Sequence, residues 1–112
     1  MDEATARKLV EAERGRVKQL LRDVNESGRE DREWARQPGD AADPAQPLTF
    51  EEESDAVAES LRQRLAALDR AMERIEEGTN GRSGRSWAPI PDARLEADPA
   101  ADLTIDEASE AL

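Results

Sequence analysis

The chain has 112 residues and a formal net charge of −11, and 38% of its residues are charged whereas only 3% are aromatic. A charge of this sign and size disfavours binding to nucleic acid through the phosphates or to an anionic membrane surface. The sequence contains no cysteine and no histidine, which excludes thiol and imidazole catalysis and the usual ligands of zinc.

The composition also indicates the compartment and the fold class. No apolar run approaches the roughly 20 residues that a membrane-spanning helix needs, and the first residues lack the pattern of a signal peptide. We therefore expect a cytoplasmic protein. Ala, Leu, Glu and Arg are abundant, which favours long amphipathic helices, and the predicted fold class is all-α.

The first predicted element is an amphipathic helix over residues 2–27. Gly28 is predicted to stop it, and residues 29–36 either extend it or form a separate turn anchored by Trp34. Its apolar residues recur at helical spacing along one face, and they are Val10, Val17, Leu20 and Val24, flanked by Leu9 and Leu21.

A second helix is predicted between Thr49, as its N-cap, and Gly78, as its stop. Three consecutive glutamates follow Thr49 and suit the positive end of the helix dipole. Its apolar stripe has steps of three, four and seven residues, and it consists of Phe50, Val57, Leu61, Leu65, Leu68, Met72 and Ile75.

Each of these helices has one apolar face that must leave water. The predicted solution is a long antiparallel helical hairpin over residues 1–78, in which the two stripes pack together as a coiled coil. The alternative is that each stripe packs against a second copy of the chain, whereas the hairpin predicts a monomer.

Between the helices lies an acidic segment. Residues 29–55 contain three basic and nine acidic residues, a net charge of −6. Proline and glycine interrupt helix formation in the second half of the predicted tip loop, 29–48. The acidic charge is either functional at this tip or simply solvated.

Residues 79–112 are predicted to form a small C-terminal lobe. A glycine-rich turn leads to a short helix over 92–97, with Pro91 at its start, and a last helix over 105–112 is capped by Thr104 or Asp106. A lobe of this length is too short to be stable alone without an additional stabilising element, such as a bound metal.

Two stretches of this last third resemble a known family. The runs IEEGTNG, at residues 75–81, and PIPDARLEADPAADL, at residues 89–103, resemble the C-terminal zinc-finger region of the DksA/TraR family. Those bacterial proteins carry a long helical hairpin followed by a four-cysteine zinc lobe. The same order of elements extends the resemblance over essentially the whole chain.

The resemblance implies where zinc ligands would lie, and the ligands are missing. The two C-x-x-C pairs of the family fall here on Ser83 and Ser86 and then on Thr104 and Glu107. Hydroxyls do not replace thiolates on zinc, and one carboxylate cannot complete a tetrahedral site. We therefore predict a degenerate zinc finger that binds no zinc and has no other cofactor.

An apolar core is the predicted substitute for the metal. The alternative is that the lobe has become a flexible tail. The predicted core residues are Trp87, Ile90, Leu95, Leu103 and Ile105.

The tip carries a second match to the family. Its RNA polymerase regulators have an acidic tip of the form D-x-x-D-x-A, which Asp40, Asp43 and Ala45 fulfil here. The resemblance implies a hairpin that enters the secondary channel of bacterial RNA polymerase and brings these residues near the catalytic centre. There they would alter the stability of promoter complexes. The other interpretation is that both aspartates only form turns beside proline.

Two other classes of function compete with transcription regulation. One is a protein–protein interaction module with a purely structural hairpin and no polymerase role. The other is an enzyme, which we do not expect because catalysis needs a concave, desolvated pocket and a two-helix rod offers almost none. Sequence-specific DNA binding is not expected either, because the sequence has no basic stripe.

Overall fold

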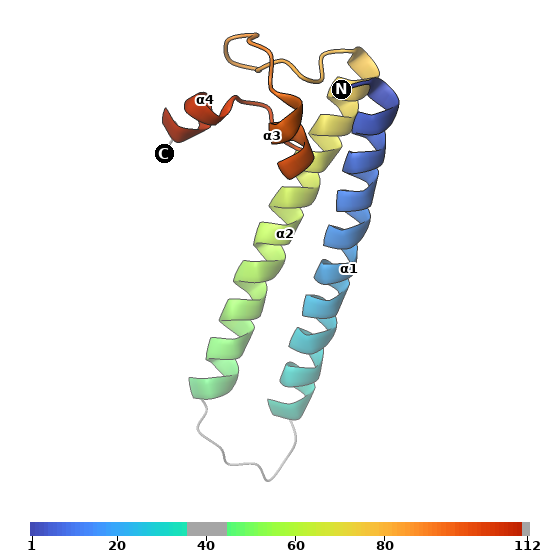
Figure 1. The fold of residues 1–112 in the computed structure, drawn as a ribbon. Helices are drawn as coiled ribbons and strands as arrows, with labels where there is room; N and C mark the ends of the chain where they lie inside the picture. The colour runs from blue at the N-terminus through green and yellow to red at the C-terminus, as the bar shows by residue number, and fades with distance from the viewer. Residues whose placement is uncertain (36–44, 111–112) are drawn as a thin grey trace. The chain divides into compact units, whose positions relative to one another are not determined.

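A computed structural model describes residues 1–35 and 45–110 of the chain, and the side chains of residues 1–27 and 53–110. The elements, in chain order, are α1 (Glu3–Ala35), α2 (Ala45–Glu77), α3 (Asp92–Ala97) and α4 (Ile105–Glu110) (Figure 1). No strand occurs in these two ranges, which confirms the all-α prediction. Within them, no helix is both long and apolar enough to cross a bilayer.

Helix α1 starts at a side-chain cap and extends further than predicted. The Thr5 backbone N–H donates to Asp2 Oδ1 at 2.7 Å. The hydroxyl of Thr5, and after it this backbone N–H, lowers the pKa of Asp2. Gly28 does not stop the helix, and of the two possibilities for the residues after it the extension is confirmed, because α1 continues to Ala35. One glycine costs a helix only about 1 kcal/mol, and the charged, alanine-containing run after it is a good helix former.

Helix α2 also starts earlier than predicted, at Ala45, so Thr49 is not its N-cap. Pro47 is tolerated because it lies in the first turn, where backbone N–H groups have no partner within the helix. The predicted tip loop over 29–48 is therefore too long, since 29–35 and 45–48 are helical.

The end of α2 at Gly78 is confirmed and has a specific geometry. The Gly78 N–H donates to the carbonyl of Ile75 at 3.2 Å, and the Thr79 N–H donates to the carbonyl of Arg74 at 2.9 Å. These are the two hydrogen bonds of a Schellman motif, which requires a left-handed residue at the position after the helix. Gly78 adopts this conformation with φ 76°.

The two long helices form the predicted antiparallel hairpin, and the chain divides into two compact units. The first unit comprises Met1–Gly15 and Leu65–Leu112, and the second comprises Arg16–Arg64. The lobe after residue 78 thus belongs with adjoining segments of α1 and α2. In the first unit, Arg14 Nε and Asp69 Oδ1 form an ion pair across the helices at 2.9 Å.

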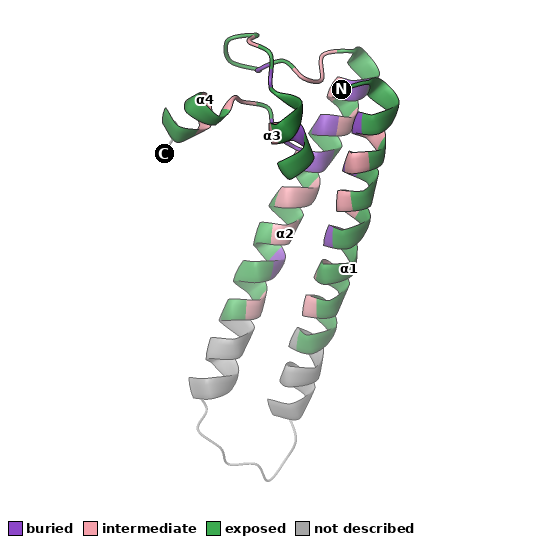
Figure 2. Cartoon of the chain, in the orientation of Figure 1, coloured by how far each residue is buried: buried purple, intermediate pink, exposed green. Residues whose placement is uncertain are grey.

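The buried residues of the hairpin include small ones that the sequence analysis did not select. Figure 2 shows the burial along both helices. Val10, Val17, Leu68 and Ile75 are buried as predicted, whereas Leu20 and Val57 are 45% and 48% exposed and were wrongly placed in the seam. The buried residues that were missed are Ala6, Ala58 and Ala71.

Candidate functional site

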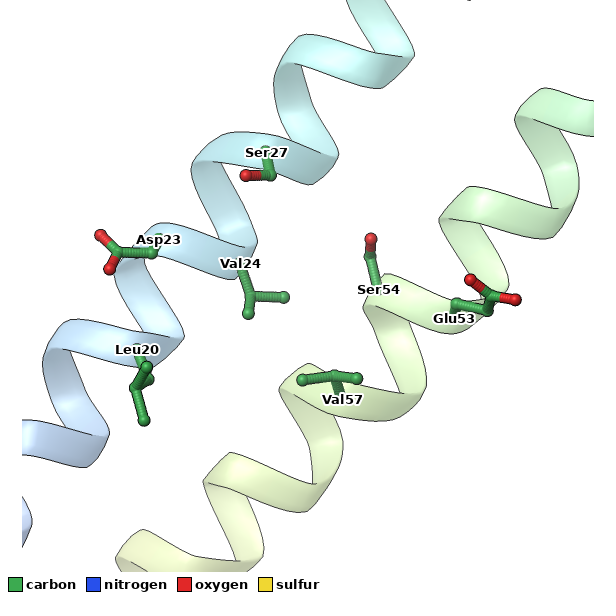
Figure 3. A pocket seen from close by; sticks show the side chains of 7 residues that line it. All are labelled: Leu20, Asp23, Val24, Ser27, Glu53, Ser54 and Val57. Atoms are coloured by element: carbon green, nitrogen blue, oxygen red, sulfur yellow. The ribbon is translucent and has the colours of Figure 1, made fainter.

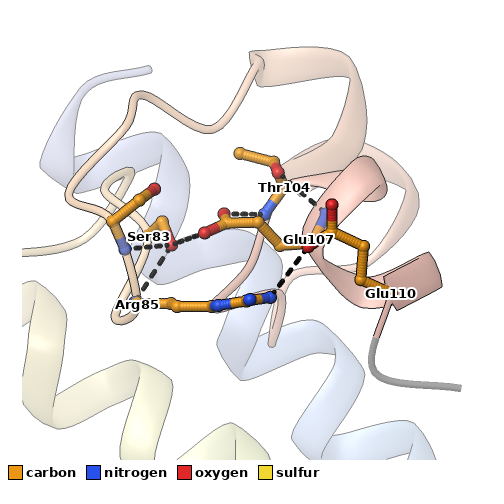
Figure 4. Close-up of polar contacts among 6 residues, drawn as sticks. Ser83, Arg85, Thr104, Glu107 and Glu110 are labelled. Atoms are coloured by element: carbon orange, nitrogen blue, oxygen red, sulfur yellow. Dashed lines mark hydrogen bonds and ion pairs between the residues drawn. The ribbon is translucent and has the colours of Figure 1, made fainter.

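A cluster of polar side chains lies where the resemblance placed the zinc ligands. Ser83 is only 1% exposed, and its hydroxyl is the centre of this cluster (Figure 4). Ser83 Oγ accepts the backbone N–H groups of Arg85 and Ser86, each at 3.1 Å, and donates to Glu107 Oε2 at 3.0 Å. The turn after α2 is thereby joined to α4.

Thr104 and Glu107 form the other half of the cluster. The Glu107 N–H donates to Thr104 Oγ1 at 3.3 Å, and the Thr104 N–H donates to Glu107 Oε1 at 3.0 Å. This reciprocal pair is a capping box at the start of α4, in the sequence pattern T-x-x-E. Thr104, rather than Asp106, is therefore the cap of this helix.

We call these four residues the Ser83 cluster; they are Ser83, Ser86, Thr104 and Glu107. The surroundings of Glu107 in this cluster favour its ionised form. The backbone N–H of Thr104 is the main cause, followed by the hydroxyl of Ser83, and together with smaller contributions they lower the pKa of Glu107 to about 2. Hydrogen bonds to a carboxylate stabilise its charged form. The carboxylate is therefore a fixed anionic acceptor at neutral pH.

These residues do not fit a zinc ion. Three of the four offer only hydroxyl oxygens, and both carboxylate oxygens of Glu107 already accept hydrogen bonds. Among the side chains that the structure describes, those of residues 1–27 and 53–110, no group of three or more His, Cys, Asp or Glu is arranged to hold a metal. Zinc prefers thiolate and imidazole ligands in a closed tetrahedral site. That the protein binds no zinc stays a prediction, and it rests on this donor set.

Next to the cluster is a small apolar core of Ile90, Leu95 and Ala101. Ile90 and Leu95 are 5% and 3% exposed, and Leu103 is half-buried. The prediction was wrong for Trp87 and Ile105, which are 59% and 60% exposed. Hydrogen bonding around Ser83 therefore stabilises the lobe together with a core smaller than expected.

Two arginine side chains donate hydrogen bonds to backbone carbonyls of the segment that follows α3. Arg94 Nε donates to the carbonyl of Leu103 at 2.7 Å, and Arg74 of α2 donates to the carbonyl of Ala100 at 3.4 Å. Asp92 Oδ1 also accepts the N-terminal ammonium of Met1 at 2.9 Å, which raises the pKa of that ammonium group. The sequence analysis did not assign these contacts, because nothing in residue type or spacing distinguishes these side chains from other charged surface residues.

Arg85 and Glu110 form an ion pair at 3.0 Å beside the cluster (Figure 4). Both side chains are more than half exposed, at 58% and 64%, so the pair contributes little to stability. It links the turn to the last turn of α4. The T-x-x-E pattern could have revealed the capping box from the sequence, whereas this ion pair has no such signature.

The second unit contains an open cleft between α1 and α2 with a volume of about 350 Å³. In Figure 3, Val24 and Val57 project from the two helices into this space. Its lining residues are Leu20, Asp23, Val24, Ser27, Glu53, Ser54 and Val57. The two helices are therefore incompletely packed along this stretch.

The residues of the predicted tip are not part of this geometry. Asp40 and Asp43 lie outside the described residues, and Ala45 is the first residue of α2, with its side chain outside them. The predicted anchoring by Trp34 concerns a side chain that is outside them as well. The structure therefore describes α1, which ends before the predicted tip, and α2, which begins after it.

Comparisons with known proteins identify the fold. No family model matches the sequence, and no curated protein matches it. The structure is similar to a solved structure of the transcription factor DksA2 from Pseudomonas aeruginosa, with a TM-score of 0.83 and 23% identity, over 97% of this chain and 81% of that chain. The chain therefore has a DksA-like fold.

Proposed function

We propose that the protein is a bacterial transcription regulator of the DksA/TraR type that binds RNA polymerase and has no catalytic activity of its own. The observation that carries the proposal is the match in fold to the transcription factor DksA2 over 97% of the chain. The sequence resemblance in the last third supports the proposal independently, because it depends on which amino acids occur at residues 75–81 and 89–103 and not on how the helices pack.

In this proposal the hairpin enters the secondary channel of the polymerase in the cytoplasm. Each long helix has 33 residues, which corresponds to about 50 Å of rise along a helix axis. Asp40 and Asp43, with Ala45 beside them, would then lie near the catalytic centre. Carboxylates at such a place accept charge-assisted hydrogen bonds from basic or amide groups of the enzyme.

The first test is binding to purified bacterial RNA polymerase core enzyme. The proposal predicts a stable complex in a pull-down with the immobilised full chain, and excess free protein should displace the polymerase. A chain that is folded by circular dichroism but retains no core enzyme would contradict the proposal and would favour the alternative of an interaction module with another partner.

A cross-linking experiment tests the site of insertion. A photoreactive amino acid in place of Ala42, beside the tip aspartates, should cross-link to the polymerase subunits that line the secondary channel. The same amino acid in place of Glu96, an exposed residue of α3, serves as the control. Cross-links from position 42 to any other part of the polymerase would contradict insertion.

A further inference from the structure

The turn between α2 and α3 has a charge opposite to that of the chain. Residues 78–91 contain two arginines and no acidic residue, in a chain with a net charge of −11. Arg82 is exposed and forms no ion pair with any residue that the structure describes. Arg85 forms an ion pair with the exposed carboxylate of Glu110, and its own side chain is 58% exposed, so both guanidinium groups remain accessible.

This turn is held rigidly by backbone hydrogen bonds. The Ser83 N–H donates to the carbonyl of Ala88 at 2.8 Å, and the Trp87 N–H donates to the carbonyl of Ser83 at 3.0 Å. Arg82 and Pro89 form an antiparallel bridge at its base. The backbone of this turn therefore has a defined conformation from which its side chains project.

Trp87 occupies the turn at a cost in conformational energy. Its φ is 65°, and it is the one non-glycine residue with positive φ in the described part of the chain. L-residues disfavour this left-handed region, and a large side chain gains little by being there unless it is buried. Trp87 is 59% exposed, so burial within this chain does not offset the strain. Strained, exposed side chains of this kind are typical of binding sites.

We infer that Trp87, together with Arg82 and Arg85, is a docking surface for a short acidic segment of a partner protein that also carries an apolar side chain. Trp and Arg are the residues most enriched among those that dominate the binding energy of protein interfaces. The two arginines select an acidic segment by charge complementarity, and Trp87 supplies the apolar anchor. The inference rests on the proposed function, so the partner segment belongs to RNA polymerase.

A protein segment fits this surface better than a nucleic acid does. The acidic residues Asp92, Asp106 and Glu110 border the lobe and would repel the continuous phosphates of a longer polyanion. A short acidic segment carries fewer negative charges, and of those carboxylates it has to meet only that of Glu110, which is already paired with Arg85 at 3.0 Å. The surface is therefore small and specific.

The test compares variants for binding to purified core RNA polymerase and for thermal unfolding of the free protein. Trp87→Gly should weaken binding at least tenfold while leaving the unfolding midpoint equal to or above that of the wild type, because glycine relieves the strain at positive φ. Arg82→Glu should also weaken binding at least tenfold, more so at low salt. Arg70→Glu, an equal charge change at an exposed position of α2, should bind as the wild type does.

The outcomes separate this inference from the proposed function. A wild-type chain that does not bind the polymerase overturns both. A wild type that binds, with Trp87→Gly binding equally well, overturns the docking surface and leaves the proposed function intact. If Trp87→Gly lowers the unfolding midpoint together with the affinity, Arg82→Glu decides, and an unchanged dissociation constant for that variant overturns the inference.

Discussion

The hydroxyl of Ser83 shows how a single buried group can organise a small lobe. It accepts two backbone N–H groups of its own turn and donates to Glu107 of α4. A buried hydroxyl that loses its partners costs free energy, so the satisfied arrangement fixes both the turn and the helix start. Glu107 in turn completes the capping box with Thr104.

The ionisation of Glu107 gives a first prediction. Its pKa in the folded protein is about 2 and its ordinary value is 4.5, so its contribution to stability is present above about pH 4.5 and is lost as the pH falls towards 2. Glu107→Gln should be less stable than the wild type at neutral pH, and urea unfolding should show the difference shrinking between pH 5 and pH 2. The control Glu96→Gln, at an exposed site of α3, should show no such trend. A difference for Glu107→Gln that is constant with pH would contradict the assignment.

The donor set of the Ser83 cluster gives a second prediction. The pure protein should contain no stoichiometric zinc, and a chelator should leave its unfolding midpoint unchanged. The variant Ser83→Cys, Ser86→Cys, Thr104→Cys and Glu107→Cys should instead bind a single zinc ion, since four thiolates would then surround one point, and its midpoint should fall with chelator. Metal analysis checks both proteins. Zinc in the wild type, or none in the four-cysteine variant, would contradict the account of the cluster.

Among the secondary-structure elements, the helix ends show how far local sequence determines structure. The stop at Gly78 was predictable because the Schellman motif needs a left-handed residue, and glycine adopts that conformation at least cost. Thr104 was predictable as a cap for a similar reason. Gly28 and Thr49 were misassigned because the helix continues through both, and neither residue type forbids a helix interior.

Burial was harder to predict than helix position. Helical periodicity correctly predicted that Val10 and Leu68 are buried. The exposure of Leu20 and Val57 depends in addition on how closely the two helices approach each other, which periodicity does not determine. The position of Ser83 in the lobe depends on Glu107, which is 24 residues away along the chain. Contacts at such separation have no local signature, and the exposed Trp87 was taken for core because large aromatic residues usually are.

The difference in burial along the hairpin gives a third prediction, at the scale of the helix pair. Leu68→Ala should destabilise the protein by about 2–5 kcal/mol, because Leu68 is 0% exposed and its loss leaves a cavity. Val57→Ala, at a site that is 48% exposed beside the open cleft, should cost less than about 1 kcal/mol. Chemical denaturation measures both. Equal losses would contradict the description of the cleft as an incompletely packed segment.

For the molecule as a whole, charge is unevenly distributed. The segment from residue 29 to residue 55 carries a net charge of −6, and residues 78–91 carry only positive charge. Most of α2 lies between these two segments along the sequence. In the proposed complex the acidic tip acts on the catalytic centre, and the turn with Trp87 contributes to docking.

The most direct test of this account is the lifetime of open promoter complexes formed by the cognate RNA polymerase. The wild-type protein should change this lifetime, and the double variant Asp40→Asn, Asp43→Asn should bind the polymerase yet leave the lifetime as it is without protein. The control Glu96→Gln, Asp102→Asn removes the same charge from exposed sites of the lobe and should act as the wild type does. A tip variant that changes the lifetime as fully as the wild type would contradict the central claim.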